Sequence, residues 1–589
     1  MKILLVAINA KYSHTNLAVR SLSAYAPVHS RAVKDGLVSV ALGEWNVNQP
    51  HGAVVRGIFS ANPDVVLFST YIWNRDAVFR CARDVRKVLP SAIIGLGGPE
   101  VSWDPERAFR ECPDTDLVMS GEGEATFAEF CDRIACEGLD GAENRELLFS
   151  GIPGLYVRRA GGVDEAPYVF GGERPPLANL DDIPFPYGPE QPPFEPEHRI
   201  AYYESSRGCP FRCAYCLSSR DGGVRYRSLG LVLDEIAWFL DAGYPLVKFV
   251  DRTFNLEPAR FLRIWEFIRD RHNGKTRFHF EIAAECLPDE AFPLLETMPP
   301  GSVQFEIGIQ SANPETLAAV SRPARLDALA ERIRRIPRSI PLHLDLIAGL
   351  PGEDLASFAR SFDYAFAFGS DALQLGFLKI LPGTGMERIA RDSAGYTWSE
   401  NPPYEVLSSP VLSYADLLVL KEVETLVDAW HNAGLMRHTL RHLASRNGGA
   451  FSLFRTLAAH AARFFPDGDL FLPRRPTDAF ACMASWLAER KDAMALEWLR
   501  YDFLLQGKPG AIPPWCVRRY SKEAHDAALA ATGMLDRPGG HPMSRREAYS
   551  VSEYERFEFN QDGRERAYLF RYANCGRSGE KGPVSAIPV

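Results

Sequence analysis

The first 150 residues alternate short apolar runs with segments in which apolar residues recur at helical spacing. The runs predict strands and the intervening segments predict helices. The expected strands are 2–10, 38–47, 64–72, 92–97 and 116–119, and the expected helices are 16–25, 51–60, 75–89 and one that ends near 134. Five strands alternating with helices indicate an α/β fold with a doubly wound parallel sheet.

The same alternation returns after residue 199. Expected strands are 200–203, 246–250, 277–282, 302–309, 341–347 and 372–380, with helices between them, among them 258–271 and 355–367. Six such units predict a (β/α)6 partial barrel, in which chemistry gathers at the carboxyl ends of the strands.

The remaining segments have other patterns. Residues 151–198 are rich in Gly and Pro and read as a linker with a small hairpin near 154–159. Beyond 391 the pattern is helical over 413–443, 451–465 and 477–503, and two β-rich runs flank Gln561-Asp562-Gly563, a hairpin signal. We expect the tail from Gly576 to be disordered. The predicted domains are 1–150, 199–390 and a mainly helical 391–589 with a terminal β-hairpin, with 151–198 as the linker.

Composition narrows the class of protein. The chain has 589 residues, of which 46% are hydrophobic and 24% charged, as in a soluble globular protein. A formal net charge of −9 gives no support for nonspecific nucleic-acid binding. The sequence contains no run of 18 apolar residues, so it predicts no membrane span. Eleven cysteines in 589 residues are too few to predict a disulfide scaffold. We expect a cytoplasmic protein.

Three cysteines lie in one loop after the strand at 200–203: Cys209, Cys213 and Cys216. Thiolates suit zinc or iron–sulfur clusters. A structural zinc site uses four ligands, and no fourth cysteine lies nearby in the sequence. Three thiolates would leave one iron of a four-iron cluster open to another ligand, although a zinc loop or an unrelated group of cysteines also fits the motif alone.

The CxxxCxxC spacing, with Tyr215 before the last cysteine, resembles the signature of the radical S-adenosylmethionine (SAM) superfamily. The resemblance implies a [4Fe-4S] cluster with Cys209, Cys213 and Cys216 as metal ligands and SAM as the ligand of the fourth iron. It also implies reductive cleavage of SAM to a 5′-deoxyadenosyl radical.

The later strand ends of the expected barrel add polar residues at positions that resemble the SAM contacts of this superfamily. Carboxylates suit the hydroxyl and ammonium donors of SAM, and Arg suits its carboxylate. The matched positions are Tyr215, Val250, Asp251, Arg252, Glu281, Gln310, Arg322 and Asp345.

The first 150 residues resemble the cobalamin-binding domain that precedes many radical SAM domains. Ligands of such sheets lie outside the carboxyl ends of the strands, where small residues allow a close approach. The expected cobalamin contacts are Ser69, Thr70, Tyr71, Gly97, Gly98, Gly121, Glu122 and Gly123. The family's DxHxxG pattern is absent from the sequence, so we expect no histidine of this domain to bind cobalt.

The resemblance therefore implies a cobalamin-dependent radical SAM enzyme, with methyl transfer from methylcobalamin to an unactivated carbon as the expected reaction. Such enzymes need an electron donor such as flavodoxin or ferredoxin, and the substrate would be a small molecule or a peptide. Beyond the cofactor ligands, the sequence identifies no catalytic residue. The alternatives are a cobalamin-binding radical SAM enzyme that forms a ring or rearranges a skeleton, an RNA methylthiotransferase with a second cluster, and a noncatalytic cobalamin or SAM sensor.

Overall fold

The computed structural model describes residues 1–136, 142–159, 168–189, 199–220, 223–322, 325–535, 543–559, 565–572 and 584–589. The chain forms two compact units. The first contains residues 1–308, 314–342 and 377–410, and the second contains residues 309–313, 343–376 and 411–589.

The N-terminal sheet has seven strands in the order β2-β1-β3-β4-β5-β6-β7. Its strands are β1 (Lys2–Asn9), β2 (Ser39–Asn46), β3 (Val65–Ser69), β4 (Ile93–Gly97), β5 (Leu117–Met119), β6 (Leu155–Arg158) and β7 (Tyr168–Phe170). The first five pair in parallel, which confirms the predicted α/β sheet. Strands β6 and β7 come from the segment expected to be a linker, and they add antiparallel to the sheet edge.

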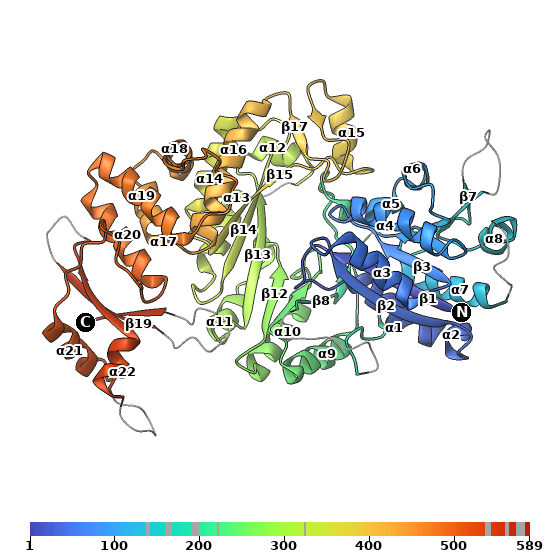
Figure 1. Ribbon diagram of the computed structural model, residues 1–589, viewed down its shortest axis with the longest axis horizontal. Helices are drawn as coiled ribbons and strands as arrows, with labels where there is room; N and C mark the ends of the chain where they lie inside the picture. Colours follow the sequence, from blue (N-terminus) through green and yellow to red (C-terminus); the bar gives the residue numbers. More distant parts are fainter. Residues whose placement is uncertain are drawn as a thin grey trace. The chain divides into compact units, whose positions relative to one another are not determined.

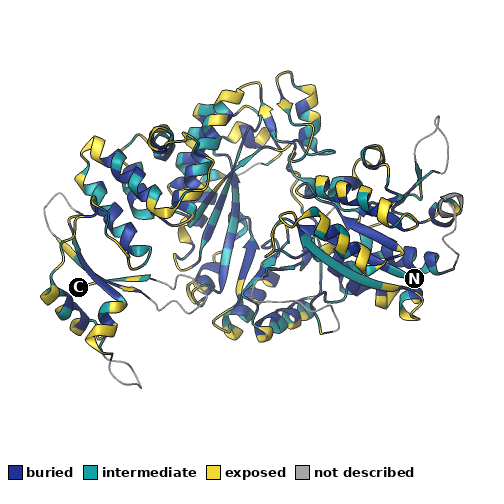
Figure 2. Cartoon of the chain, viewed as in Figure 1, coloured by how far each residue is buried: buried dark blue, intermediate teal, exposed yellow. Residues whose placement is uncertain are grey.

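Helices cover both faces of this sheet (Figure 1). They are α1 (Leu17–His29), α2 (Arg31–Lys34), α3 (His51–Ala61), α4 (Arg75–Val88), α5 (Pro99–Ser102), α6 (Pro105–Glu111), α7 (Gly123–Cys136) and α8 (Ala142–Phe149). Alternate residues of β1 enter two separate apolar cores: Ile3 and Leu5 pack on the side of α1 and α7, and Leu4 and Val6 on the side of α3 and α4. Figure 2 shows β1, β3, β4 and β5 as mostly buried, whereas the edge strand β2 is mostly of intermediate burial. Burial of both faces explains why the strands read as continuous apolar runs.

The second sheet has the order β15-β14-β13-β12-β11-β8. Its strands are β8 (Ala201–Tyr203), β11 (Leu246–Phe249), β12 (Arg277–Glu281), β13 (Val303–Gln310), β14 (Leu342–Ala348) and β15 (Ala372–Phe377). The register is parallel from β8 through β11 and β12 to β13. Sequential strands lie side by side, as the (β/α)6 prediction requires.

Helices follow these strands in the chain. They are α9 (Leu229–Ala242), α10 (Pro258–Arg271), α11 (Ala291–Glu296), α12 (Pro314–Ala319), α13 (Leu326–Arg335), α14 (Leu355–Phe366) and α15 (Gly385–Asp392), with the short helices η1 (Leu180–Asp182), η3 (Leu217–Arg220) and η4 (Ala284–Cys286). Trp265 of α10 stacks on Phe305 of β13 and meets Phe280 of β12, so the helix-facing side of these strands is aromatic.

The C-terminal region is mainly helical, as expected. Its helices are α16 (Tyr414–Leu426), the π-helical η5 (Val427–Asn432), α17 (Arg437–Ala444), α18 (Ala450–Phe464), α19 (Pro476–Arg490), α20 (Ala493–Leu505), α21 (Lys522–Ala531) and α22 (Arg545–Ser550). The predicted continuous helix 477–503 is interrupted at Lys491, which adopts a left-handed φ of 53°. A short two-stranded sheet, β16 (Thr397–Trp398) with β17 (Val406–Ser408), precedes this region.

The terminal hairpin is present as β18 (Ser552–Phe557) and β19 (Arg566–Tyr572), while its predicted turn lies outside the described residues. The expectation of a disordered tail was wrong for its last residues. Strand β20 (Val584–Pro588) pairs antiparallel with β19, because Val584 and Ala586 pack against an aromatic cluster that contains Phe557 and Phe570. Residues 573–583 lie outside the described part.

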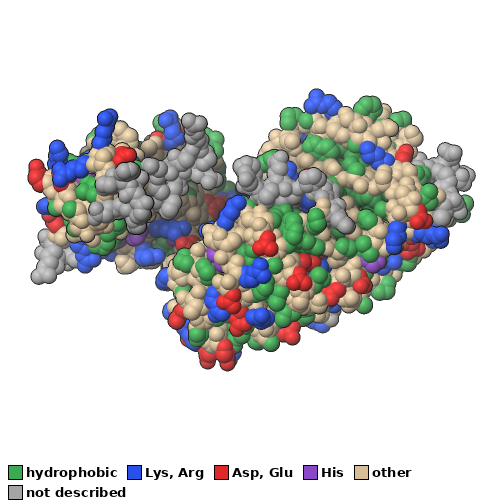
Figure 3. All heavy atoms as spheres, turned by 90° about the horizontal axis from the view of Figure 1, so that it is seen from below, with side chains coloured by type: hydrophobic (Ala, Val, Ile, Leu, Met, Phe, Trp, Pro, Cys, Tyr) green, Lys and Arg blue, Asp and Glu red, His purple; other side chains and the backbone are tan. Residues whose placement is uncertain are grey.

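Within the described residues, no helix is long and apolar enough to cross a membrane. Acidic and basic side chains are interspersed on the face drawn in Figure 3.

Candidate functional site

The cysteine loop is closed at its base by a two-stranded ribbon. Strand β9 (Ser206–Arg207) pairs antiparallel with β10 (Arg225–Tyr226), and Arg207 lies directly opposite Arg225. Gly208 follows with a φ of 103°, and a Cβ on it would lie 2.0 Å from the carbonyl oxygen of Gly223. Only glycine permits this crossing of the two chain segments. We call β9, β10 and Gly208 together the neck of the loop.

The three cysteines are brought together beyond this neck. Cys213 is buried, and Cys209 and Cys216 are half-buried. Burial raises the pKa of the Cys209 thiol, and the charges of Cys216 and Cys213 raise it further, so the three sulfurs lie within electrostatic reach of one another. The Cys209 sulfur also lies 3.7 Å from the hydroxyl of Thr253.

Two neighbouring segments brace the loop. The backbone N–H of Ala214 donates to Val320 at 2.9 Å, and the N–H of Met386 donates to the carbonyl of Ala214 at 2.8 Å. A Cβ on Gly385 would lie 3.3 Å from Ala214, so α15 packs closely on the loop.

Tyr215 and Arg322, both predicted at the SAM site, flank the cysteines. One guanidinium nitrogen of Arg322 lies 3.8 Å from the Cys213 sulfur, and another donates to the carbonyl of Gly308 at 2.6 Å. The Nε of Arg322 and the hydroxyl of Tyr215 are buried and have no hydrogen-bond partner among the described residues. Burial raises the pKa of Tyr215, although nearby Arg322 opposes the shift.

Val250, Asp251 and Arg252 directly follow β11, and their side chains lie in different environments. The Val250 N–H donates to Tyr203 at 2.8 Å. The carboxylate of buried Asp251 accepts from the Ser205 N–H at 2.9 Å and from the hydroxyls of Ser205 and Ser206 at 2.6 Å each. Both of its oxygens are therefore engaged in holding the strand that precedes the cysteine loop, and Arg252 is exposed.

Glu281 ends β12, as predicted. Its carboxylate lies 3.6 Å from the ammonium of Lys248, which also lies 3.1 Å from Glu306. Burial raises the pKa of Glu281 and outweighs the opposing charge of Lys248.

Gln310 and Asp345 belong to the second unit. Gln310 ends β13 with a left-handed φ of 67°, and its side-chain oxygen is buried with no hydrogen-bond partner among the described residues. Asp345 lies on β14, 3.2 Å from His343. A left-handed φ at a non-glycine residue is strained, and such strain is common at ligand sites. The assignment of Gln310 to the SAM site stays a prediction.

Ser69, Thr70, Gly97 and Gly98 meet at the carboxyl edge of the first sheet. Ser69 pairs with Gly97 in the β3–β4 register, and the Thr70 N–H donates to Gly97 at 2.7 Å. Gly98 has a φ of 106°, and a Cβ there would lie 2.6 Å from the Thr70 carbonyl. The Thr70 hydroxyl is buried and has no hydrogen-bond partner among the described residues. Gly98 therefore lets the two strand ends pack backbone to backbone at this edge, while the Thr70 side chain is enclosed by the protein.

Tyr71 is held beside this edge. Its N–H donates to Asn74 at 2.7 Å, and its ring stacks on Trp73 with centroids 4.3 Å apart. Burial raises the pKa of Tyr71, while Arg252 lowers it and Glu204 raises it. The β3 edge of the first sheet therefore lies within electrostatic reach of residues at the β8 and β11 ends of the second sheet.

The Gly121–Glu124 loop faces the neck of the cysteine loop. Glu122 accepts from Arg225 and from the Leu177 N–H at 2.8 Å, and it lies 3.2 Å from Arg207. Glu124 pairs with Arg207 at 2.8 Å. The carboxylate of Glu122, predicted as a cobalamin contact, is thus occupied by protein groups. Gly121 is exposed with nothing within 4 Å of a Cβ position, whereas a Cβ on Gly123 would lie 3.3 Å from the side chain of Leu22.

Sequence reasoning missed Arg207, Arg225, Glu124 and His14 as residues that join the two sheets. His14 lies after β1 and pairs through Nδ1 with the hydroxyl of Tyr202 at 3.0 Å. An arginine immediately before Gly-Cys, together with the acidic Gly-Glu-Gly-Glu run, was the available signal for an ion pair. The pairing partners lie about 80 residues apart, which local pattern cannot reveal.

Three other cysteines of the first domain have described side chains, and they lie in two separate cores. Cys81 and Cys112 lie in the core on one face of the sheet and Cys131 in the core on the other face. Burial raises the pKa of each thiol. Among the described residues these three therefore offer no second iron–sulfur site of the kind an RNA methylthiotransferase needs.

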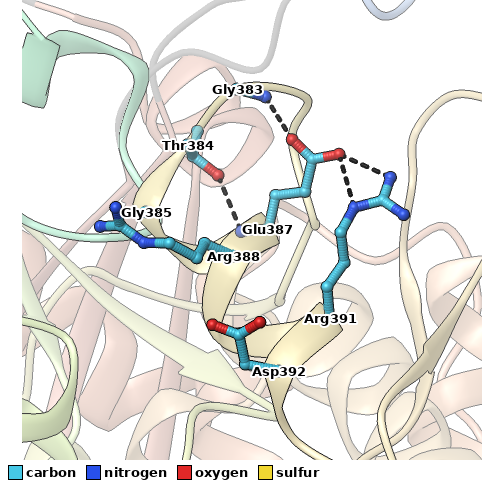
Figure 4. A pocket seen from close by; sticks show the side chains of 7 residues that line it. All are labelled: Gly383, Thr384, Gly385, Glu387, Arg388, Arg391 and Asp392. Carbon is cyan, nitrogen blue, oxygen red and sulfur yellow. Dashed lines mark hydrogen bonds and ion pairs between the residues drawn. The ribbon is translucent and has the colours of Figure 1, made fainter.

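A cavity of about 330 Å³ lies at the start of α15 (Figure 4). Its lining residues are Gly383, Thr384, Gly385, Glu387, Arg388, Arg391 and Asp392. Glu387 accepts from the Gly383 N–H at 2.5 Å and pairs with Arg391 at 2.8 Å, while Thr384 caps the helix. The helix N-terminus is therefore satisfied by its own carboxylate.

The residues present fit the cofactors that the fold implies. Three thiolates in one loop are suitable donors for iron, with the unsatisfied polar atoms of Tyr215 and Arg322 beside them. At the other edge, Gly121 is exposed with nothing within 4 Å of a Cβ position, and Gly98 packs on the Thr70 backbone beside the unsatisfied Thr70 hydroxyl.

Three family models match the chain in sequence order. Residues 3–131 match the B12 binding domain, and residues 203–365 match the radical SAM superfamily. Residues 392–567 match DUF4080, a family of proteins of unknown function. The matches fall on the three segments described above.

Two similar proteins are named as methyltransferases. An uncharacterised methyltransferase of Pyrococcus horikoshii is 27% identical over 346 residues, which is 57% of this chain and 71% of that protein. The cobalamin-dependent radical SAM methyltransferase TokK of Streptomyces tokunonensis is 27% identical over 54% of this chain, but the match spans only 47% of TokK.

A solved structure shares the fold. The cobalamin-dependent S-adenosylmethionine radical enzyme OxsB, with aqua-cobalamin and S-adenosylmethionine bound, superposes with a TM-score of 0.58 at 16% identity, covering 92% of this chain and 82% of OxsB. The B12-binding, radical SAM and DUF4080 domains in this order, together with the three-cysteine loop, show that the chain belongs to the cobalamin-dependent radical SAM enzymes, whose domains imply a [4Fe-4S] cluster, SAM and cobalamin as cofactors.

Proposed function

We propose that this radical SAM enzyme is a methyltransferase that adds a methyl group to an unactivated carbon of its substrate. The observation that carries the proposal is the connection, inside one compact unit, between the cysteine loop and the carboxyl edge of the cobalamin-binding sheet. The methyltransferase names of the two relatives support it.

The bound cofactors would supply the difficult chemistry, with cobalamin as methyl carrier and the cluster with SAM as the source of a hydrogen-abstracting radical. The chain's own residues position and shield them. Cys209, Cys213 and Cys216 would hold the iron, and Arg322 and Tyr215 offer polar groups to SAM beside Cys213. Thr70, Gly97 and Gly98 would accept the corrin closely.

Arg322 has the clearest individual role. Its guanidinium is fixed by the Gly308 carbonyl and keeps one N–H unsatisfied next to the cysteines. A fixed arginine with a free donor suits a carboxylate, the group that SAM presents at the cluster. We propose that Arg322 orients SAM through this contact.

A second candidate is a cobalamin-binding radical SAM enzyme that does not methylate. The likeness to OxsB, whose name describes a radical enzyme without stating methyl transfer, supports this reading. In either case an electron donor such as flavodoxin or ferredoxin would reduce the cluster, and the substrate would be a small molecule or peptide.

The two candidates differ in what they do to SAM. The enzyme would be reconstituted without oxygen with iron, sulfide and cobalamin, reduced, and given SAM labelled with deuterium in its methyl group. The methyltransferase reading predicts both S-adenosylhomocysteine and 5′-deoxyadenosine, and a labelled methyl in products formed from a fractionated metabolite extract.

Formation of 5′-deoxyadenosine alone, with no S-adenosylhomocysteine, would contradict methyl transfer and favour the second candidate. Absence of both products would contradict an enzymatic role and favour a cobalamin or SAM sensor.

A further inference from the structure

The neck of the cysteine loop contains an electrostatic conflict. Arg207 and Arg225 are directly opposed in the β9–β10 register, and their side chains are 17% and 25% exposed. Like charges directly opposite in an antiparallel pair destabilise it, and partial burial reduces the screening by water. The ribbon needs a counter-charge to stay closed.

The counter-charge that both arginines share comes from the cobalamin-binding domain. Glu122 lies between the two arginines, with one oxygen, Oε2, 3.2 Å from Arg207 and 3.1 Å from Arg225. Arg225 reaches both oxygens, so the contact is bidentate and charge-assisted. Burial alone would raise the pKa of Glu122, but Arg225 and Arg207 outweigh it and hold the pKa below its usual range. The carboxylate is thus charged at neutral pH.

Further contacts fix the same loop to the neck. Arg207 pairs with Glu124 at 2.8 Å and with Glu204 at 2.7 Å. Arg225 donates to the Leu177 carbonyl at 2.6 Å, and Glu122 accepts from the Leu177 N–H, so one residue of the connecting segment joins both partners. Gly121 and Gly123, the proposed corrin-facing positions, lie on either side of Glu122.

The geometry points to a coupling device: we propose that Glu122, Arg225 and Arg207 link occupancy of the cobalamin site to the closed conformation of the cysteine loop. The proposal rests on the corrin lying against the Gly121–Gly123 backbone. A corrin seated there fixes Glu122 between the arginines, and Glu122 in turn holds the neck in the conformation that receives the cluster. Arg225 is a positioning residue in this device.

Coupling of this kind is reciprocal. If cobalamin favours the closed neck, then a cluster that also requires the closed neck must favour cobalamin by the same factor. Typical couplings change affinity about 5-fold to 150-fold. The protein should therefore bind hydroxocobalamin at least about fivefold more tightly with its cluster than without it.

The test measures hydroxocobalamin affinity by absorbance titration, without oxygen, on cluster-loaded and cluster-free full-length protein. A second readout is the rate at which a chelator removes iron from the loaded protein, with and without hydroxocobalamin. We expect cobalamin to slow iron loss in the wild type. In Arg225→Gln the affinity ratio should fall to about one and the protection of iron should vanish, while Arg225→Lys, which keeps the charge, should restore part of both.

Arg199→Gln is the matched control. Arg199 is similarly exposed, at 21%, and pairs with Glu44 at 2.8 Å, which also joins the two sheets, but it lies outside the neck. It should retain the wild-type ratio. Equal affinities in the two wild-type forms, or an unchanged ratio in Arg225→Gln, would overturn the coupling while leaving the proposed function standing. Failure of every form to bind hydroxocobalamin would overturn the cobalamin site itself.

Discussion

Asp251 shows how a residue can sit at a predicted site and face elsewhere. Its position at the end of β11 follows from the alternation of apolar and polar residues. Its side-chain direction does not, because the partners are two serines at the end of another strand, 45 and 46 residues earlier. Three hydrogen bonds stabilise its charge, yet burial dominates and raises its pKa to about 6. Two other features could not be predicted from local sequence either. They are the left-handed φ of Gln310 and the pairing of Glu122 with arginines of a distant segment.

The raised pKa of Asp251 predicts a pH-dependent stability. The folded state binds a proton more tightly than the unfolded state, whose pKa is near 3.8, so this contribution is fully present below pH 3.8 and is lost as pH rises through about 6. A shift of about two units corresponds to roughly 3 kcal/mol. The unfolding free energy of wild type minus that of Asp251→Asn should therefore decrease from pH 4 to pH 6.5 and level off above about pH 7.

Chemical denaturation followed by tryptophan fluorescence at a series of pH values would measure this difference. Ser228→Ala is a suitable control, since its side chain makes no cap contact at the start of α9. A difference that stays constant, or one that grows with pH, would contradict the assigned burial of the Asp251 charge.

The elements themselves were largely predictable. The strands of both sheets were found within a few residues, because both faces of the first sheet and one face of the second are apolar and give a clear pattern. The small hairpin expected near 154–159 is present as β6 and β7, but its addition to the edge of the first sheet was not predicted. Strand β20 was missed, because it is a short strand that packs on a cluster contributed by other segments. Sequence pattern also gave no sign of the two-residue strands of the neck.

Gly208 gives an element-scale prediction for this neck. In Gly208→Ala the new Cβ would lie 2.0 Å from the Gly223 carbonyl, and the left-handed φ would add strain of roughly 1–3 kcal/mol. We expect the ribbon to open and the protein to take up less than about a tenth of the wild-type iron on anaerobic reconstitution, measured by iron content and absorbance near 400 nm. Because the first domain does not contain Gly208, its folding should be retained.

Gly230→Ala provides the comparison. Gly230 lies in α9 with open space around the position of a Cβ, so the substitution should leave iron uptake unchanged. Full iron incorporation by Gly208→Ala would show that the crossing of the neck does not control the cluster.

At the scale of the whole molecule, the first unit joins the N-terminal domain to the segment from β8 to β10 through polar and charged side chains. These contacts include the Arg207–Glu124 pair and the His14–Tyr202 hydrogen bond. The order of the domains was predictable from the sequence, and the family models agree with it. The contacts between the two domains could not be predicted from the sequence, because they join residues between about 80 and 190 positions apart. The described part of the C-terminal region folds into helices and a three-stranded sheet.

The most direct measurement is the formation of 5′-deoxyadenosine from SAM by protein reconstituted without oxygen and reduced with a strong chemical reductant. The wild type should form this product, and Cys209→Ala, Cys213→Ala and Cys216→Ala should each form none, because every thiolate is needed to hold the cluster. Cys286→Ala, which changes a half-buried cysteine outside the loop, should retain the product. Product formation by any one of the three loop variants, or its absence from the wild type, would contradict the account.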